Sequence, residues 1–418
     1  MARQADSIAE VVASGLCIGC GLCEALSGGR ATMTMTDYGA LRPNPVDTFT
    51  ASEEAELLAV CPGVRVEPRQ EAASAVDAIW GGVLDMRYAW SGDADVRHRG
   101  ATAGVLTTLG QHLLATGRVE FVAHVGSNPA NPAFNHAVIS ESGEAMLSRA
   151  GSRYAPVSPL TNFIRALDRN KPFALIAKPC DLNAVHRLSK RDQRVDELCV
   201  ARLAMVCGGQ SRHTKTRGLL NHFGVSESDV RLLRYRGFGN PGLTHVETHQ
   251  GDTHQRTYLE EWGDESSWEL ETRCKLCPDA LGEAADLVVA DVWPGGAPTG
   301  EDAGFSGIIV RTQAGQALVD ETVAAGQIIL GEPISPRQFD DFQPHQRRKK
   351  LALAARFDGL TDAGLPTIDA RDLRLTELGY RCDSDEYQRE RQGTAQRARD
   401  GRIAEPAPFS ASRRSVTN

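Results

Sequence analysis

Short apolar runs alternate with longer stretches of mixed polarity through the middle of this chain. Apolar residues recur at intervals of three and four between residues 105 and 114, which predicts a helix there, and Gly117 is suited to end it. Alternating strands and helices indicate an α/β (α+β mixed) domain with a mostly buried sheet. The apolar runs predict strands at residues 119–125, 173–177, 202–206, 287–293 and 307–311.

The first part of the chain follows a different pattern. A short helix is expected within residues 1–16, and the alternation around Met33 predicts a small hairpin over residues 31–41. Ser52 is followed by an acidic turn and then by leucines, which predicts a helix that leads to Cys61. These elements suit a small ferredoxin-like module.

A linker rich in alanine and charge, from Glu67 to Val76, separates this module from the strand–helix region. Near the other end, a basic segment of four residues, Arg347 to Lys350, precedes a predicted helix. This segment indicates either a solvated helix end or a docking patch for an acidic electron carrier. From Cys382 onward the sequence is polar, which favours a disordered tail. The expected units are a ferredoxin-like module (1–66), an α/β catalytic domain (80–345), a helical segment (346–381) and the tail (382–418).

Composition narrows the classes of function. The chain has 418 residues, of which 41% are hydrophobic, and a formal net charge of −8. This acidity argues against nucleic acid as a partner, and no apolar run is long enough to span a membrane. Ten cysteines without a recognisable export signal favour metal or redox chemistry in a reducing compartment, so a cytoplasmic location is expected.

Cys17, Cys20 and Cys23 are each separated by two residues, one of them glycine. A fourth cysteine, Cys61, is followed by proline, as in the loops that hold a cubane cluster in ferredoxin-type domains. The spacing therefore favours a [4Fe–4S] cluster on these four thiolates. Zinc or a redox disulfide is the alternative, although three evenly stepped cysteines overfill one zinc knuckle.

A second set of four cysteines lies in the strand–helix region. Cys180 and Cys207 each follow a predicted strand, and open α/β sheets place their chemistry at the carboxyl ends of strands. Cys274 and Cys277 form a C-x-x-C pair. A zinc site completed by a histidine such as His213 is the alternative to a second cluster. The cysteines outside both sets are Cys199 and Cys382.

Further motifs extend from about residue 15 to about residue 355. Besides the cysteines, they are Arg99–Thr107, Gly151–Tyr154, Lys178–Asp181, Cys207–Gly209, Tyr235–Gly237, Cys274–Asp279, Ala285–Asp291, Gly304–Ser306 and Arg311–Thr312. In combination they resemble the coenzyme F420 hydrogenase/dehydrogenase β-subunit family. The resemblance implies FAD in the α/β domain, a [4Fe–4S] cluster on the second cysteine set and a further cluster on the first set.

The resemblance also implies where FAD binds. The turn before the predicted helix at residue 105 would present backbone N–H groups and a helix dipole to the FAD phosphates. Ala101 to Ala103 depart from the glycine-rich sequence that is common in the family at this turn. The residues expected to bind FAD are Gly100, Ala103, Gly104, Thr107, Ser152, Arg153 and Tyr154.

Two residues are candidates for catalytic roles. Lys178 stands beside a proposed cluster ligand, where its charge would neutralise the flavin or attract an anionic substrate. Asp291 ends a strand, where it would serve in proton transfer or make a strand-end hydrogen bond. Arg236 is a further candidate, for binding an acidic substrate.

The resemblance implies an iron–sulfur flavoprotein oxidoreductase. It would pass electrons from ferredoxin or a similar carrier through two clusters and FAD to a small organic acceptor, coenzyme F420 or a tetrapyrrole-like substrate. The alternative is an electron-transfer β subunit of a larger hydrogenase or dehydrogenase complex without its own organic acceptor. A zinc-stabilised binding protein is a third hypothesis. We expect either a homo-oligomer or an assembly with hydrogenase or dehydrogenase partner subunits.

Overall fold

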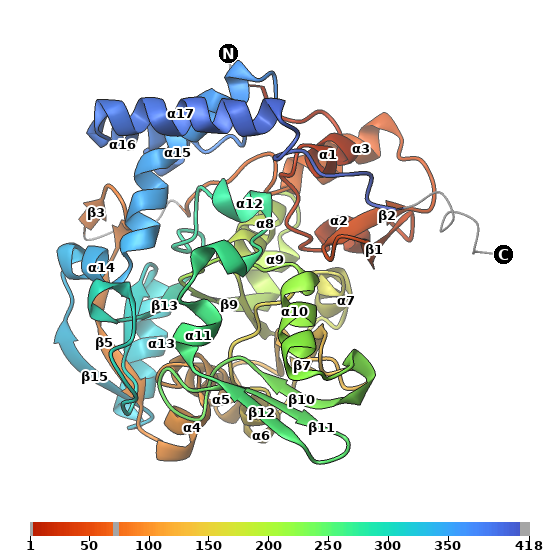
Figure 1. Cartoon of the computed structure of the whole chain (residues 1–418). Helices are drawn as coiled ribbons and strands as arrows, with labels where there is room; N and C mark the ends of the chain where they lie inside the picture. Colours follow the sequence, from red (N-terminus) through yellow and green to blue (C-terminus); the bar gives the residue numbers. More distant parts are fainter. Residues whose placement is uncertain (1–2, 70–74, 410–418) are drawn as a thin grey trace.

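The structure is a computed structural model that describes residues 3–69 and 75–409. An eight-stranded sheet runs through its centre (Figure 1). Its strands, in spatial order, are β15 (Ile328–Pro333), β5 (Asp85–Ser91), β14 (Ser306–Val310), β13 (Leu287–Asp291), β9 (Cys199–Met205), β8 (Phe173–Ala177), β6 (Phe121–Ser127) and β7 (Asn135–Ser140).

The four central strands of the sheet, β13, β9, β8 and β6, are parallel. The strands on either side pair antiparallel. The mixed α/β fold predicted from the alternation of strands and helices is therefore confirmed, with an antiparallel portion at each edge. Because the parallel strands all end at the same edge, the residues that follow them are brought together there.

Helices cover both faces of the sheet because the side chains of its strands alternate. In β8, Phe173 and Leu175 join one apolar cluster, and Ala174 and Ile176 join the other. The first face packs against α7 (Phe163–Asp168), α8 (Pro179–Ser189), α9 (Arg194–Leu198) and α14 (Pro336–Phe342). The second face packs against α5 (Val105–Ala115), α6 (Gly143–Ser148) and α13 (Gln313–Ala324).

The periodic patterns located most central elements correctly. The helix predicted at residues 105–114 is α5, and the strand predicted at residues 173–177 is β8. A three-stranded sheet beside the main body was not predicted, because its strands are short and partly exposed, which weakens their hydrophobic signal. Its strands are β10 (Val230–Arg234), β11 (Thr244–Thr248) and β12 (Thr253–Arg256).

The N-terminal segment contains the elements expected of it, including the hairpin. Its apolar residues Ile18, Leu22 and Val60 belong to the same cluster as those beneath the central sheet, so the segment shares that core. Its division from the rest at residue 66 stays a prediction. Its elements are α1 (Ile8–Ala13), α2 (Leu22–Leu26), β1 (Ala31–Met35), β2 (Leu41–Pro45) and α3 (Ala51–Val60).

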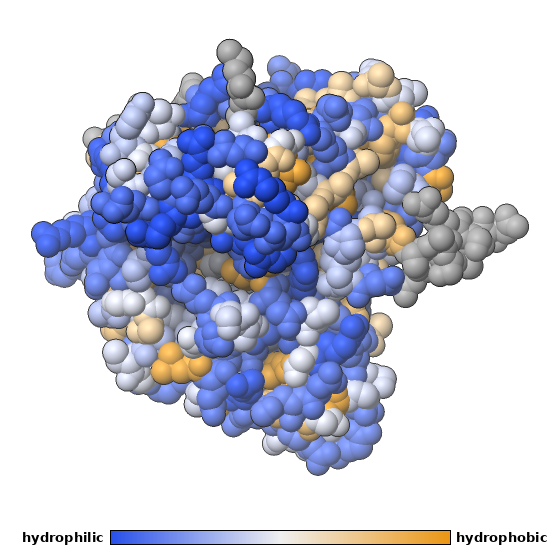
Figure 2. Space-filling view, turned by 45° about the horizontal axis from the view of Figure 1, so that its top comes forward, coloured by the Kyte–Doolittle hydropathy of each residue, from blue (hydrophilic) through white to orange (hydrophobic). Residues whose placement is uncertain are grey.

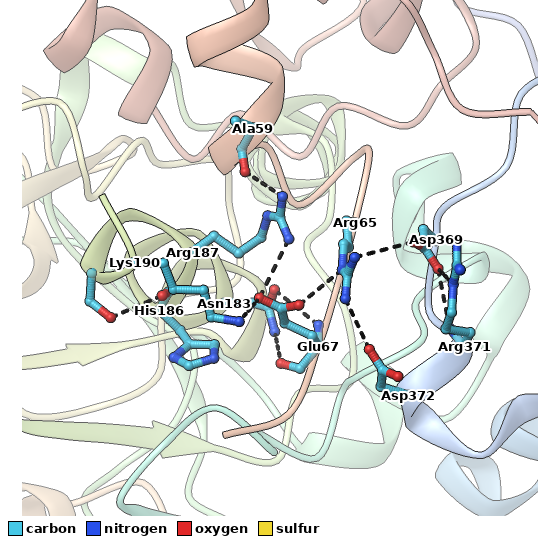
Figure 3. A network of polar contacts seen from close by, with 11 residues as sticks. Ala59, Arg65, Glu67, Asn183, His186, Arg187, Lys190, Asp369, Arg371 and Asp372 are labelled. Carbon is cyan, nitrogen blue, oxygen red and sulfur yellow. Dashed lines mark hydrogen bonds and ion pairs between the residues drawn. The ribbon is translucent and has the colours of Figure 1, made fainter. Parts of the chain in front are cut away.

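A polar network joins the end of this segment to α8 and to the C-terminal region (Figure 3). The buried carboxylate of Glu67 pairs with Arg65 at 2.9 Å and with Lys190 at 2.5 Å. Arg65 also pairs with two aspartates near the C-terminus. The expected linker, residues 67–76, thus begins at a buried anchor, and residues 70–74 of it lie outside the described residues.

The prediction of a disordered tail from residue 382 is wrong for the described part of that region. Residues 384–399 form a helix, α17 (Ser384–Arg399), that lies along α15 (Pro344–Asp362) (Figure 1). Polar contacts hold the two helices together, including the Arg391–Asp362 ion pair at 2.6 Å. The sequence pattern missed α17 because few of its residues are apolar, and the C-terminal helices form a hydrophilic face (Figure 2). Residues after 409 lie outside the described chain.

The remaining helices and strands are short or connect the larger elements. Within the described ranges, none of the helices combines the length and the apolar character needed to cross a membrane. These elements are β3 (Ala75–Asp77), β4 (Gly81–Val83), α4 (Ala94–Arg99), α10 (His213–Phe223), α11 (Tyr258–Trp262), α12 (Thr272–Lys275) and α16 (Leu375–Arg381).

Candidate functional site

All four cysteines of the N-terminal set line one small cavity of about 30 Å³, which we call the outer cavity. Cys17 and Cys20 lie in the loop between α1 and α2, Cys23 lies in the first turn of α2, and Cys61 follows the end of α3. The rest of the lining is apolar or glycine: Ile8, Val11, Ile18, Gly19, Gly21, Leu22, Met33, Pro43, Leu57, Val60, Pro62 and Gly63. The cysteines that were grouped by spacing therefore meet in space.

The second set, Cys180, Cys207, Cys274 and Cys277, lines another cavity of about 20 Å³, which we call the inner cavity. Ile18 lies in the lining of both cavities, so they are neighbours. The other residues of the inner lining are Lys178, Pro179, Gly209, Arg273, Asp279, Ala280 and Lys349.

The thiols of both sets lie in an environment that opposes free thiolates. Burial raises the pKa of Cys17 to about 12, although Arg42 lowers it, and burial also raises the pKa of Cys274 to about 12. Backbone N–H groups point at two of the sulfurs: Gly19 donates to Cys17 Sγ at 3.4 Å, and Gln210 donates to Cys274 Sγ at 3.2 Å. Four thiols with amide donors and little water suit a cationic iron–sulfur core that displaces their protons.

A single zinc ion and a cubane cluster place different demands on four thiolates. In residues 3–69 and 75–409, no three or more His, Cys, Asp or Glu side chains are grouped tightly enough to hold one metal ion. Zinc would draw four sulfurs to about 2.3 Å from one centre, whereas a cubane cluster binds each thiolate through a different iron and keeps the sulfurs further apart. His213 stacks on Phe134 with ring centroids 4.0 Å apart and pairs with Glu227, so it is engaged away from the cysteines.

A third site, which we call the large cavity, has a volume of about 320 Å³ and lies at the carboxyl ends of the parallel strands. This volume lies within the range of small-molecule sites, about 300–1,000 Å³. The cavity brings together every residue that was predicted to bind FAD and both catalytic candidates: Gly100, Ala103, Gly104, Thr107, Ser152, Arg153, Tyr154, Lys178 and Asp291. The structure therefore gathers these residues at one site, while their contacts with a flavin stay a prediction.

The turn before α5 packs tightly against α4. Gly104 has φ +71° and caps the N-terminus of α5, and a Cβ there would lie 2.6 Å from the carbonyl oxygen of Val96. Glycine is therefore required by both the backbone conformation and the close approach. The N-terminus of the eleven-residue helix α5 opens on the cavity, as a phosphate site at this turn requires.

Arg153 lines the cavity, but its guanidinium group holds other parts of the protein. It donates to Asn135 Oδ1 at 2.7 Å and to the carbonyl oxygen of Leu233 at 2.5 Å. It also donates to the carbonyl oxygens of Pro132 and Phe134. With these nitrogens engaged, we interpret Arg153 as a residue that shapes the cavity wall.

Lys178 lies between the inner cavity and the large cavity, because it lines both. Its Nζ is 2.9 Å from the buried carboxylate of Asp181. Burial opposes the charge of Lys178, but Asp181, together with the sulfurs of Cys180 and Cys207, raises its pKa above the usual value. An ammonium has three N–H donors and Asp181 is its one carboxylate partner among the described residues, so Lys178 retains donors for a ligand.

Asp291 does not stand alone at the end of β13. Both of its oxygens pair with the buried guanidinium of Arg236, at 2.9 and 3.1 Å, and Thr102 Oγ1 donates to it at 2.5 Å. Arg236, which we expected to bind an acidic substrate, is thus engaged with Asp291. The Arg236–Asp291 pair fixes the loop of Thr102 beside the end of β13. The strand-end hydrogen bonding that was the alternative to a role of Asp291 in proton transfer is therefore present.

Apart from Tyr154, the aromatic part of the lining was not anticipated. Tyr154 packs against Trp262 with ring centroids 4.5 Å apart. Trp262 Nε1 and Ser306 Oγ are buried without a hydrogen-bond partner in the described chain, and both residues line the cavity. Such a combination of aromatic surface and orphaned donors fits a planar, polar-edged ring system such as a flavin. The cluster of aromatics between residues 258 and 268 was the available signal.

The large cavity adjoins the inner cavity as well. Lys178, Cys207 and Gly209 line both. The three cavities therefore form a series: outer, inner and large. Ile18 stands at the first junction and Cys207 at the second.

Fold and site together define a class of α/β proteins in which two cysteine-lined cavities lead to a ligand-sized cavity at the ends of parallel strands. The chain belongs to the coenzyme F420 hydrogenase/dehydrogenase β-subunit family. Residues 86–165 match the model of the N-terminal part of this family, and residues 170–335 match the model of its C-terminal part. This membership indicates an oxidoreductase. The matched residues include the second cysteine set, whereas the N-terminal set lies outside them.

Two curated proteins illustrate the relationship. The coenzyme F420-dependent sulfite reductase of Methanocaldococcus jannaschii is 22% identical over 328 residues, which are 74% of this chain and 46% of that protein. The F420-dependent formate dehydrogenase 1 subunit beta of Methanococcus maripaludis is 24% identical over 256 residues, 60% of this chain and 62% of that protein. The chain thus spans about half the length of the curated relatives it matches.

Among solved structures, a chain of the F420-reducing [NiFe] hydrogenase complex from Methanosarcina barkeri aligns with a TM-score of 0.48. It is 17% identical, and the alignment covers 66% of this chain and 95% of that chain.

Proposed function

We propose that this protein is an iron–sulfur flavoprotein oxidoreductase. It would take electrons from ferredoxin or a similar carrier, pass them through two [4Fe–4S] clusters and FAD, and deliver them to a small organic acceptor. The single observation that carries the proposal is the series of three adjoining cavities, two lined by four cysteines each and the third large enough for a ligand.

The residues present suit each group. The two cysteine sets would hold the clusters, and the turn before α5 would bind the FAD phosphates through backbone N–H groups. Bound FAD supplies the exchange between one-electron and two-electron chemistry. Lys178 would hold positive charge against the flavin ring and hydrogen-bond to it, from a position between the flavin and the inner cluster. Trp262 and the other aromatic residues of the lining would pack against the ring and exclude water from this side of the site.

Among the acceptors considered, the names of the relatives favour coenzyme F420, because both curated proteins are described as F420-dependent. A tetrapyrrole-like substrate is the competing acceptor. Anaerobic assays that supply each acceptor to the dithionite-reduced protein distinguish the two, since only the true acceptor reoxidises the flavin band at a catalytic rate.

Composition tests the proposal directly. Protein purified without oxygen should contain about eight irons, about eight labile sulfides and about one FAD per chain, as two cubanes and one flavin require. Reduced ferredoxin should bleach both the flavin band and the iron–sulfur absorption. A colourless protein that contains zinc and no labile sulfide would contradict the proposal.

A second candidate is an electron-transfer β subunit of a larger dehydrogenase or hydrogenase complex. The similarity to a formate dehydrogenase β subunit favours it. The two candidates differ in what the isolated chain does. A self-contained reductase turns over its acceptor with a one-electron carrier alone, whereas a β subunit elutes with partner subunits from its native host and shows carrier-driven turnover only in their presence.

A further inference from the structure

The outer and inner cavities differ in charge. Apart from the cysteines, the described lining of the outer cavity is uncharged. Three cationic side chains, Lys178, Arg273 and Lys349, line the inner cavity, together with one carboxylate, Asp279. A charge in a dry cavity acts strongly on another charge nearby, because little water screens it.

The cations of the inner cavity are only partly neutralised by carboxylates. Lys178 is paired with Asp181. Arg273 is buried and donates to the carbonyl oxygen of Pro62 at 2.9 Å. Among the described residues, no ion pair joins Arg273 or Lys349 to a carboxylate. Asp279 offsets part of this charge, and its own oxygens accept N–H groups from the backbone.

The cations near the outer cavity have carboxylate partners. Arg42, whose charge lowers the pKa of the Cys17 thiol, pairs with Glu271 and Glu405, both at 2.5 Å. Arg187, whose charge lowers the pKa of the Cys61 thiol, pairs with the same Glu67 that anchors the network of Figure 3.

Arg273 interacts electrostatically with thiols of both sets, with Cys61 as well as with the inner cysteines. It therefore does not distinguish the two sites. Lys349 distinguishes the two sites, because of the three cavities it lines only the inner one, and its charge lowers the pKa of the Cys207 thiol.

Lys349 is held in place by the first turns of α15. Gln346, one turn earlier, donates to the carbonyl oxygen of Cys207 at 2.7 Å and so fixes the helix against the inner cavity. The neighbouring Lys350 is buried in an ion pair with Glu283, and Arg348 pairs with Glu265 on the surface. The basic segment that we weighed as a docking patch thus turns part of its charge inward.

We propose that Lys349 raises the reduction potential of the inner cluster above that of the outer cluster and thereby directs electrons inward. The inference rests on the proposed function. A four-thiolate cluster is already negative, and reduction adds one further negative charge, so a nearby cation stabilises the reduced form. Each transfer moves one electron from the outer site to the inner site, oxidising the first and reducing the second, with no bond or proton exchanged.

Hydrogen bonds to sulfur and burial also act on potential, and both are present at the two sites. Each has at least one backbone N–H directed at a sulfur, from Gly19 in the outer site and from Gln210 in the inner site. Cys20 is the buried cysteine of the outer set, and Cys180 and Cys274 are the buried cysteines of the inner set. The unequal charge is the difference that a single substitution can isolate, and Lys349 is its most separable part.

The test is an anaerobic redox titration followed by electron paramagnetic resonance. A Cys20→Ser protein, which lacks one outer ligand, identifies which signal belongs to the inner cluster. In the unaltered protein the inner signal should appear first on reduction. In Lys349→Gln its midpoint should shift downward while the outer midpoint stays unchanged, and Lys349→Arg should restore it.

Arg348→Gln is the matched control, because it removes the same charge one residue away, outside the cavity, and should move neither midpoint. The inference is overturned if the outer cluster is reduced first, or if Lys349→Gln shifts both midpoints equally or neither. Iron, sulfide and flavin contents are measured on the same samples. A deficit of iron in the unaltered protein would overturn the proposed function, and is thereby distinguished from a failure of the charge argument alone.

Discussion

Cys20 shows how one residue serves both packing and the candidate cluster. Its sulfur lines the outer cavity, while its backbone carbonyl accepts a hydrogen bond from Leu160 at 2.9 Å. Burial raises its pKa well above the usual thiol value, so an unligated Cys20 would be protonated. The sulfur therefore needs a metal centre to carry charge, and the backbone contact does not depend on that centre.

This separation predicts the result of Cys20→Ser. The variant should lose the outer cluster, about four of about eight irons per chain, and with it reduction by ferredoxin. The inner cluster and FAD should remain, because neither cavity contains Cys20. Iron and flavin assays with paramagnetic resonance measure this.

Cys199→Ser provides the control. Cys199 is also buried in the apolar core, yet it lines none of the three cavities. The Cys199→Ser protein should keep both clusters. Loss of FAD together with the outer cluster in Cys20→Ser would show that the N-terminal loop supports the whole chain and is not a separable relay.

At the scale of elements, the start of α5 positions the candidate phosphate site. Gly104 combines a left-handed backbone with a contact that leaves no room for a side chain. Gly104→Ala should destabilise the protein by about 2–4 kcal/mol and lower its flavin content, since the turn must move to relieve the clash. Thermal unfolding and flavin absorbance of the same samples measure both effects.

Gly117 is the matched comparison, at the other end of the same helix. It too has a positive φ, +69°, but a Cβ there would meet nothing within 4 Å. Gly117→Ala should therefore cost only the conformational strain, about 1 kcal/mol, and leave FAD bound. Equal losses of flavin in both variants would refute the role assigned to the turn.

At the scale of the whole molecule, Glu283 joins the C-terminal helices to the α/β body. Its buried carboxylate pairs with Lys350 at 2.7 Å and with Arg374 at 2.6 Å. Burial alone would raise the pKa of Glu283, but Lys350, Arg374 and Arg311 together lower it from 4.5 to about 2. The folded state therefore holds this carboxylate ionised where the unfolded chain would protonate it.

A depressed pKa in the folded state stabilises the protein above pH 4.5, and this contribution is lost as the pH falls from about 4.5 to about 2. The contribution is roughly 3 kcal/mol. Glu283→Gln should be less stable at pH 6, because two cations lose their partner, and its stability should fall less steeply below pH 4.5. Urea unfolding at several pH values checks this, and identical slopes in the two proteins would refute it.

The sequence by itself determined the partition of eight cysteines into two sets, the start of α5 and the central strands. Ligand type, short spacing and periodicity are local properties, so they can be read without the fold. The family resemblance, carried by short motifs in a fixed order, is confirmed by the matches to both family models. The assignment of clusters and FAD to these residues stays a prediction.

Only the tertiary structure decided how the sites adjoin. Ile18 joins the two cysteine cavities, Cys207 joins the inner to the large cavity, and Lys349 reaches the inner cavity from a helix far along the chain. In the structure, the Arg153 guanidinium donates to carbonyl groups, and the polar residues 384–399 form the helix α17. These outcomes depend on contacts between residues distant in sequence, and such contacts follow from the packing of the whole chain and not from any local pattern.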